Sequence, residues 1–124
     1  MVNKVFSIAI TIFIIDRILK VIFFNSSIIN SGAAFNLFPG QNWLFILVAL
    51  IVIIFIINHR NLKDYQIGMG LLLGGTLGNL IDRIYYSGVI DFISISIIPT
   101  FNIADLANIA GALLIISRMY KKCP

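Results

Sequence analysis

The sequence predicts an all-α integral membrane protein with four transmembrane helices and both termini in the cytoplasm. Two observations predict this fold class. First, the chain is 60% hydrophobic with a mean hydropathy of +1.03, which is more apolar surface than a soluble domain of 124 residues can bury. Second, four apolar stretches approach the roughly 20 residues that a helix needs to cross a bilayer. The length fits a single domain, residues 1–124.

The predicted spans cover about residues 5–24, 43–57, 65–86 and 102–119. The first resembles a secretory signal, but it has no small-residue cleavage site and contains Asp16, Arg17 and Lys20. It is therefore expected to be a retained span. The second consists of unbroken apolar residues. The third carries glycines at four-residue spacing from Gly70 to Gly78, a pattern that allows membrane helices to pack closely.

The distribution of lysine and arginine predicts the orientation of these spans. Basic residues precede the first span, separate the second from the third and follow the fourth; they are Lys4, Arg60, Lys63, Arg118, Lys121 and Lys122. The other two connections, about 25–42 and 87–101, contain neither lysine nor arginine. Because cytoplasmic loops carry the excess of positive charge, both termini are expected in the cytoplasm.

A second group of charged residues is expected to converge at the opposite, extracytoplasmic face. Its members are Asp16, Arg17, Lys20, Asp82, Arg83, Asp91 and Asp105. Charges inside a bilayer cost at least ~2.5 kcal/mol each on insertion scales, so they usually pair or take part in chemistry. Asp16 can pair with Lys20, and Asp82 with Arg83 or Lys20. Four aspartates face three bases, however, so pairing cannot neutralise all of them.

Asparagines lie beside several of these carboxylates. Asn79 precedes Asp82 by three residues and Arg83 by four, so all three share one helical face. Asn102 precedes Asp105 by three, which is the spacing of a helix N-cap with an acidic residue at its third position. Capping and a role in catalysis are compatible, and both stay open.

Several function classes are disfavoured by composition. The lone Cys123 cannot form an intrachain disulfide, and the lone His59 argues against a histidine-rich zinc site, so no metal and no cofactor are expected. The basic residues form no patch for nucleic acid. A small multidrug-type transporter remains an alternative, but the chain lacks glutamate and its carboxylates gather at one face rather than at the midplane.

Five short motifs resemble those of one family. Asp16 and Lys20 match Asp-x-x-x-Lys, and Asn30-Ser-Gly-Ala-Ala-Phe35 matches Asn-x-Gly-Ala-Ala-Phe. The other three are Gly78-Asn-Leu-Ile-Asp-Arg83, Val89-Ile-Asp-Phe92 and Pro99-Thr-Phe-Asn-Ile-Ala-Asp105. With these five motifs in this order on four predicted spans, the chain resembles the bacterial lipoprotein signal peptidases (signal peptidase II, or prolipoprotein signal peptidase) along nearly its whole length.

This resemblance implies a multi-pass aspartyl endopeptidase of the bacterial cytoplasmic (inner) membrane, active at its extracytoplasmic face. The implied substrate is a diacylglyceryl-modified prolipoprotein, cut before its lipidated cysteine, and the implied inhibitor is globomycin. Asp91 and Asp105 correspond to the catalytic pair, which would share a proton and activate water. The residues expected to support the pair or hold substrate are Asn30, Asn79, Asp82, Arg83, Asn102, Asp16 and Lys20. Membrane lipid is a further partner, and a monomer is expected.

The sequence departs from this family at several positions. Arg17 and Leu19 stand where the family usually has Gln and Ser or Thr, and Ser87 stands where it has Gly. The outer segment 21–29 is shorter than in relatives, where it forms part of a β-cradle, and the connection from Asp91 to Asp105 also looks trimmed. A short extracytoplasmic cradle is therefore expected. The second alternative, a non-catalytic shortened paralogue that binds lipid or lipoprotein, rests on this short segment.

Overall fold

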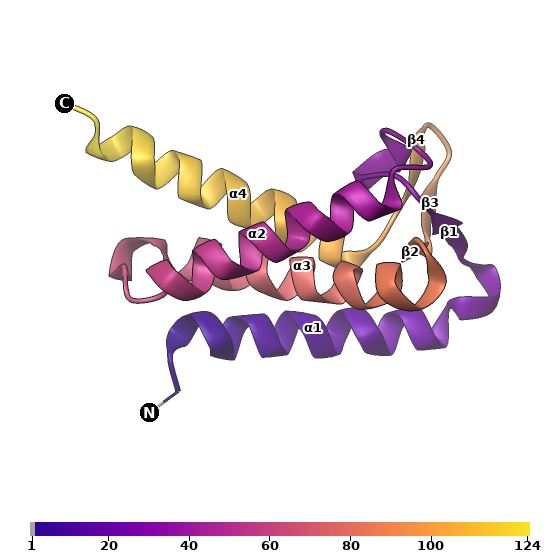
Figure 1. Ribbon diagram of the computed structural model, residues 1–124, viewed down its shortest axis with the longest axis horizontal. Helices are drawn as coiled ribbons and strands as arrows, with labels where there is room; N and C mark the ends of the chain where they lie inside the picture. Colours follow the sequence, from indigo (N-terminus) through magenta and orange to yellow (C-terminus); the bar gives the residue numbers. More distant parts are fainter. Residues whose placement is uncertain (1) are drawn as a thin grey trace.

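The computed structural model describes residues 2–124 as a bundle of four long helices (Figure 1). Their bounds are Lys4–Ile22 (α1), Asn42–His59 (α2), Gln66–Tyr86 (α3) and Ile103–Lys122 (α4). The predicted helical class is confirmed, and each helix begins and ends within three residues of a predicted span. Both termini lie at one end of the bundle (Figure 1).

Two helices within residues 2–124 are long and apolar enough to span a membrane by length and composition. They are α2, with a mean hydropathy of 2.4, and α4, with 1.4. The sequence explains why the other two differ. α1 carries Asp16, Arg17 and Lys20 near its C-terminal end. α3 is rich in glycine and carries Asn79, Asp82 and Arg83 in its C-terminal part. The charged side chains of α1 and the polar side chains of α3 lie together at one end of the bundle.

α3 packs against both α1 and α4, and its glycines allow the close approach. A Cβ atom added at Gly74 would lie 2.7 Å from the backbone oxygen of Ala9 and 2.7 Å from Cβ of Ile12 in α1. On the other side, a Cβ at Gly111 of α4 would lie 2.6 Å from the Gly68 oxygen. The close helix packing predicted from the glycine spacing is therefore present.

The apolar core lies at the end of the bundle that carries the termini. Val5 and Ala9 of α1 pack there with Ile56 of α2 and with Met69 and Leu73 of α3. All five side chains are almost completely buried. The opposite end of the bundle is built from polar residues and short strands.

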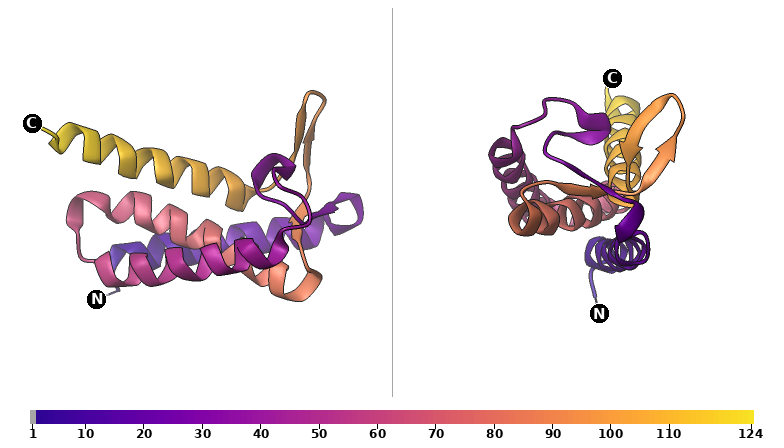
Figure 2. Two further views of the ribbon diagram at one scale, coloured as in Figure 1. Left: turned by 45° about the horizontal axis from the view of Figure 1, so that its top comes forward. Right: turned by 90° about the vertical axis from the view of Figure 1, so that its right-hand side faces the viewer.

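Two small antiparallel sheets form that opposite end (Figure 2). In the first, β1 (Ile28–Asn30) pairs with β2 (Val89–Asp91), so that Ile28 faces Asp91 and Asn30 faces Val89. In the second, β3 (Ile93–Ile95) pairs with β4 (Ile98–Phe101) as a hairpin. Short 3₁₀ helices connect the elements at Phe24–Ser26, Ala34–Asn36 and Lys63–Tyr65. The short outer segment therefore still contributes a paired strand.

α3 ends at Tyr86, and the next residue, Ser87, caps the helix with a φ of 58° in the left-handed region. This conformation normally favours glycine at a helix C-terminus, because a side chain there is strained. The turn leads through Gly88 directly into β2. The turn therefore sets the direction of β2, the strand that ends with Asp91.

Candidate active site

The end of the bundle with the strands gathers all the residues that the sequence singled out for a site. Each of the following is buried: Asp16, Lys20, Asn30, Asn79, Asp82, Arg83, Asp91, Asn102 and Asp105. They come from α1, α3, α4, β1, β2 and the residue before α4. Buried polar groups need hydrogen-bond partners, and here they supply them to one another.

Asp91 is the last residue of β2 and is 1% exposed. Asn30, at the end of the paired strand β1, donates from Nδ2 to Asp91 Oδ2 at 3.0 Å. Asn102 donates from its own Nδ2 to Asp91 Oδ1 at 3.0 Å. Both carboxylate oxygens therefore accept an amide hydrogen bond, and the carboxyl group is held in one orientation.

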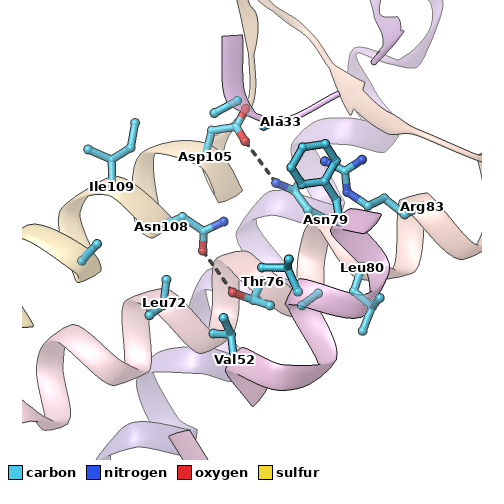
Figure 3. A pocket seen from close by; sticks show the side chains of 15 residues that line it. Ala33, Val52, Leu72, Thr76, Asn79, Leu80, Arg83, Asp105, Asn108 and Ile109 are labelled. Carbon is cyan, nitrogen blue, oxygen red and sulfur yellow. Dashed lines mark hydrogen bonds between the residues drawn. The ribbon is translucent and has the colours of Figure 1, made fainter. Parts of the chain in front are cut away.

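Asp105 lies in the first turn of α4, where it completes a capping box with Asn102. The Asn102 side chain accepts from the Asp105 backbone N–H at 2.8 Å, and Asp105 Oδ2 accepts from the Asn102 backbone N–H at 3.1 Å. The predicted N-cap is therefore confirmed. The other oxygen, Oδ1, accepts from Asn79 Nδ2 at 3.1 Å (Figure 3).

Asn102 connects the two carboxyl groups. Its backbone N–H reaches Asp105 while its side-chain amide reaches Asp91, and that amide also donates to Asn79 Oδ1 at 3.1 Å. Asn79 in turn donates to Asp105. The two aspartates therefore share a framework of amide donors although fourteen positions separate them in sequence.

A separate ion cluster lies behind these amides. Lys20 Nζ lies 2.6 Å from Asp16 Oδ2 and 2.7 Å from Asp82 Oδ2, and all three side chains are fully buried. Arg17, with its side chain 28% exposed, completes the cluster at 2.7 Å from Asp82 Oδ1. Lys20 also donates to Asn79 Oδ1 at 3.1 Å. The predicted pairs of Lys20 with Asp16 and with Asp82 are confirmed.

The alternative pairing of Asp82 with Arg83 is wrong. Consecutive helical residues point about 100° apart, so Arg83 faces away from the ion cluster. Its Nη2 donates to the Gly32 backbone oxygen at 2.6 Å and its Nη1 to Asn42 Oδ1 at 3.2 Å, while the guanidinium lies 4.8 Å above the Phe45 ring. Arg83 therefore fixes the loop after β1 rather than a carboxylate.

Charge balance within residues 2–124 sets Asp91 and Asp105 apart. Asp16 and Asp82 are neutralised by Arg17 and Lys20, whereas neither Asp91 nor Asp105 forms an ion pair. The pKa of Asp91 is raised to about 7, chiefly by burial and secondly by the negative charge of Asp105. The amides of Asn30 and Asn102 and the charge of Lys20 act in the opposite direction. The pair therefore holds a proton near neutral pH.

A cavity of about 370 Å³ opens beside Asp105 between α2, α3 and α4 (Figure 3). Asn79, Arg83 and Asp105 line its polar end, and mostly apolar side chains line the rest. Across residues 2–124, no three or more His, Cys, Asp or Glu side chains cluster in a way that could hold a metal ion. The chemistry that this site offers is proton transfer by two carboxyl groups next to an apolar groove.

Two contacts were not predicted from the sequence. Asn42, the first residue of α2, exchanges hydrogen bonds with Arg83, because its Nδ2 also donates to the Arg83 backbone oxygen at 3.2 Å. No spacing pattern marks Asn42. Arg17 was expected among the converging charges but was assigned no partner, and the structure pairs it with Asp82. The excess of aspartate over nearby bases was a signal that it neutralises one of them.

Comparison with solved structures defines the class of protein. The fold is similar to a bacterial membrane enzyme solved by the in meso method at 2.3 Å resolution, with a TM-score of 0.85 and 29% sequence identity over 98% of this chain and 90% of that one. A second bacterial membrane enzyme, solved at 1.9 Å, gives a TM-score of 0.81 at 29% identity over 99% and 96%. The fold is thus that of a bacterial membrane enzyme.

Residues 6–121 match the family described as signal peptidase (SPase) II. The chain belongs to the signal peptidase II family, as its motifs predicted. It is 38% identical to the lipoprotein signal peptidase of Halothermothrix orenii over 85% of this chain and 75% of that protein. It is 39% identical to that of Geobacillus kaustophilus over 86% and 73%.

A third relative, the lipoprotein signal peptidase of Syntrophomonas wolfei, is 46% identical over 91 residues. The match covers 70% of this chain and 61% of the relative. The chain therefore spans about three fifths of the length of that relative.

Proposed function

We propose that this chain is an aspartyl endopeptidase that removes the signal peptide from diacylglyceryl-modified prolipoproteins by cutting before the lipidated cysteine. The observation that carries the proposal is the pair of buried carboxyl groups, Asp91 and Asp105, which share amide donors but form no ion pair within residues 2–124. Membership of the signal peptidase II family and relatives named lipoprotein signal peptidase support the substrate.

All four helices cross the bacterial cytoplasmic membrane in this proposal, with both termini in the cytoplasm and the site at the extracytoplasmic face. The apolar surfaces of the helices are extensively exposed, as lipid contact requires. The end of the bundle with the termini carries six basic residues, in agreement with the rule for cytoplasmic loops; they are Lys4, Arg60, Lys63, Arg118, Lys121 and Lys122. The protein acts as a monomer, with membrane lipid around it and no nucleic acid, metal or cofactor.

In the proposed mechanism, Asp91 and Asp105 together carry one proton. The ionised carboxylate takes a proton from a water molecule as that water attacks the scissile carbonyl carbon, and the protonated carboxyl donates to the carbonyl oxygen. The tetrahedral intermediate then collapses, the C–N bond breaks, and the amine of the lipidated cysteine leaves with a proton from the pair. Asn30, Asn79 and Asn102 hold both carboxyl groups in place through these steps.

The supporting residues act at a distance from the reacting atoms. Lys20, buried between Asp16 and Asp82, donates to Asn79 and so positions the amide that holds Asp105. Arg83 fixes the loop after β1 beside the cavity. The apolar groove next to Asp105 binds the signal peptide, which is itself apolar.

Cleavage should be highest below about pH 7 and should fall as the pH rises further. The pKa of Asp91 is raised to about 7, so above that pH it loses its proton, both carboxyls become ionised and no acid remains for the leaving group. The measurement is kcat/KM for a lipidated peptide in detergent from pH 5 to pH 9, with thermal unfolding followed at each pH as a control. A profile that stays flat to pH 9 while the protein remains folded would contradict this assignment.

The direct test is a processing assay with a purified diacylglyceryl-modified prolipoprotein, run with and without globomycin. We expect release of the signal peptide, a new amino terminus at the lipidated cysteine, and loss of both in the presence of globomycin. Folded protein that binds this substrate without cutting it would support the non-catalytic paralogue instead. Proton-coupled uptake of a cationic drug into vesicles, without cleavage, would support a transporter.

A further inference from the structure

The cavity beside Asp105 contains one polar pair in its otherwise apolar part. Thr76 of α3 and Asn108 of α4 line the cavity together with Val52, Leu72 and Ile109 (Figure 3). Thr76 Oγ1 donates to Asn108 Oδ1 at 3.4 Å. This pair takes no part in the amide framework around Asp91 and Asp105.

The Asn108 amide has a donor left over. Its oxygen accepts from Thr76, whereas within residues 2–124 its Nδ2 donates no hydrogen bond to the protein. Figure 3 shows the oxygen facing Thr76 and the nitrogen turned away from it. A polar N–H group in an apolar setting without an acceptor is unfavourable. The arrangement therefore fits an acceptor that arrives with a ligand.

The position of this amide is built into the packing of α3 against α4. Gly75 of α3 is in close contact with the Asn108 amide. A Cβ atom at position 75 would lie 2.8 Å from Asn108 Cγ and 2.5 Å from the Ala104 backbone oxygen. Any larger residue at position 75 would push the amide out. Gly75 leaves the space and Thr76 sets the orientation.

We propose that Asn108 Nδ2 binds a backbone carbonyl of the signal peptide just before the bond that is cut, and that Thr76 orients the amide for this contact. The inference rests on the proposed function and names a specificity-determining residue for it. Asn108 follows Asp105 by three residues, or ~4.5 Å along the helix. An extended peptide covers about 3.3 Å per residue, so the carbonyl belongs to the second or third residue before the cysteine.

The physical need for such a donor follows from the state of the substrate. A peptide bond is accessible to two carboxyl groups only where the chain is extended, so the last carbonyls of the apolar segment lose their helical N–H partners. No water replaces those partners inside a bilayer. A donor in the groove therefore favours substrates that unwind at this point.

The alternative is that the Thr76–Asn108 bond only holds α3 against α4, as polar side chains do between membrane helices. That role would change the stability of the enzyme by the same amount whatever substrate is present. Binding of a carbonyl, in contrast, couples Asn108 to one particular atom of the substrate. The two roles can therefore be separated by changing the enzyme and the substrate together.

The experiment compares wild type with Asn108→Leu on lipidated peptides in which a single peptide bond is replaced by an ester, whose carbonyl is a weaker acceptor. For wild type, the ester at the second or third carbonyl before the cysteine should lower kcat/KM roughly 3- to 10-fold, mainly through KM. For Asn108→Leu, the same ester should have no effect. Asn61→Leu, the same change at an exposed residue between α2 and α3, should behave as wild type.

Thr76→Val provides a second measurement, because it keeps the amide but removes the hydroxyl that orients it. Its discrimination against the ester should lie between those of wild type and Asn108→Leu. Equal discrimination by wild type and Asn108→Leu at every ester position would overturn the inference and leave the proposed function intact. Failure of wild type to cut any of the lipidated peptides would overturn both.

Discussion

Asp91→Asn and Asp105→Asn should each abolish prolipoprotein cleavage while the protein still inserts and folds. Each change keeps the size of the side chain and one oxygen acceptor but removes the group that gains or donates the proton. A positioned acid or base contributes ~10²–10⁴-fold to such reactions, and here both steps use the same pair. The measurement is kcat for a lipidated prolipoprotein, with insertion checked by fractionation and folding checked by thermal unfolding in detergent.

Asp64→Asn is the matched control for these two variants. Asp64 lies in the connection between α2 and α3, where it pairs with Lys122 on the exposed surface at the end of the bundle with the termini. The same chemical change there should leave cleavage unaffected. Full activity in both the Asp91 and the Asp105 variant would rule out the carboxyl pair as the catalytic group.

Lys20→Met should cause the largest loss of stability of any single change in the helices. Lys20 is the one cation in direct contact with both Asp16 and Asp82 among the described ion pairs, and all three are fully buried. Removing one partner from a buried ion pair costs about 3–5 kcal/mol, because the remaining charge stays buried without compensation. Thermal unfolding in detergent, followed by circular dichroism, measures the effect.

Two further variants make this prediction specific. Lys122→Met removes a lysine from an exposed ion pair and should change stability little, because solvent already screens that charge. The triple change Asp16→Asn, Lys20→Met and Asp82→Asn removes all three fully buried charges together. Only Arg17 then lacks its partner, and its side chain is 28% exposed, so this variant should recover most of the lost stability. A Lys20→Met protein as stable as the Lys122→Met protein would show that the buried cluster is not under electrostatic constraint.

The positions of the helices were predictable from the sequence because each helix coincides with a long stretch that is mainly apolar, even in α1 and α3, which also carry charged residues. Charge counting also predicted that pairing could not neutralise all four aspartates, and the family motifs singled out Asp91 and Asp105, which the structure shows without ion pairs. The spacing of Asn102 and Asp105 predicted the capping box, because that interaction is local in sequence. Their roles in catalysis remain predictions.

Contacts between distant segments were harder to predict. The partner of Arg83 is a backbone oxygen, that of Gly32, and counting charged side chains cannot reveal such an acceptor. The reach of the Asn102 side chain to Asp91 depends on how β3 and β4 fold back as a hairpin. The left-handed turn at Ser87, which directs β2, has no signal in its own residue type because serine rarely adopts it.

Asn102 both caps α4 and holds Asp91, and this double role has a consequence for biosynthesis. The cap exists only when α4 is helical, and α4 follows the other three helices in chain order. While the ribosome has produced only the first three, Asp91 lacks one of its two amide donors and Asp105 has not been made. Under the proposed function, a nascent chain should therefore have no peptidase activity until its fourth helix inserts.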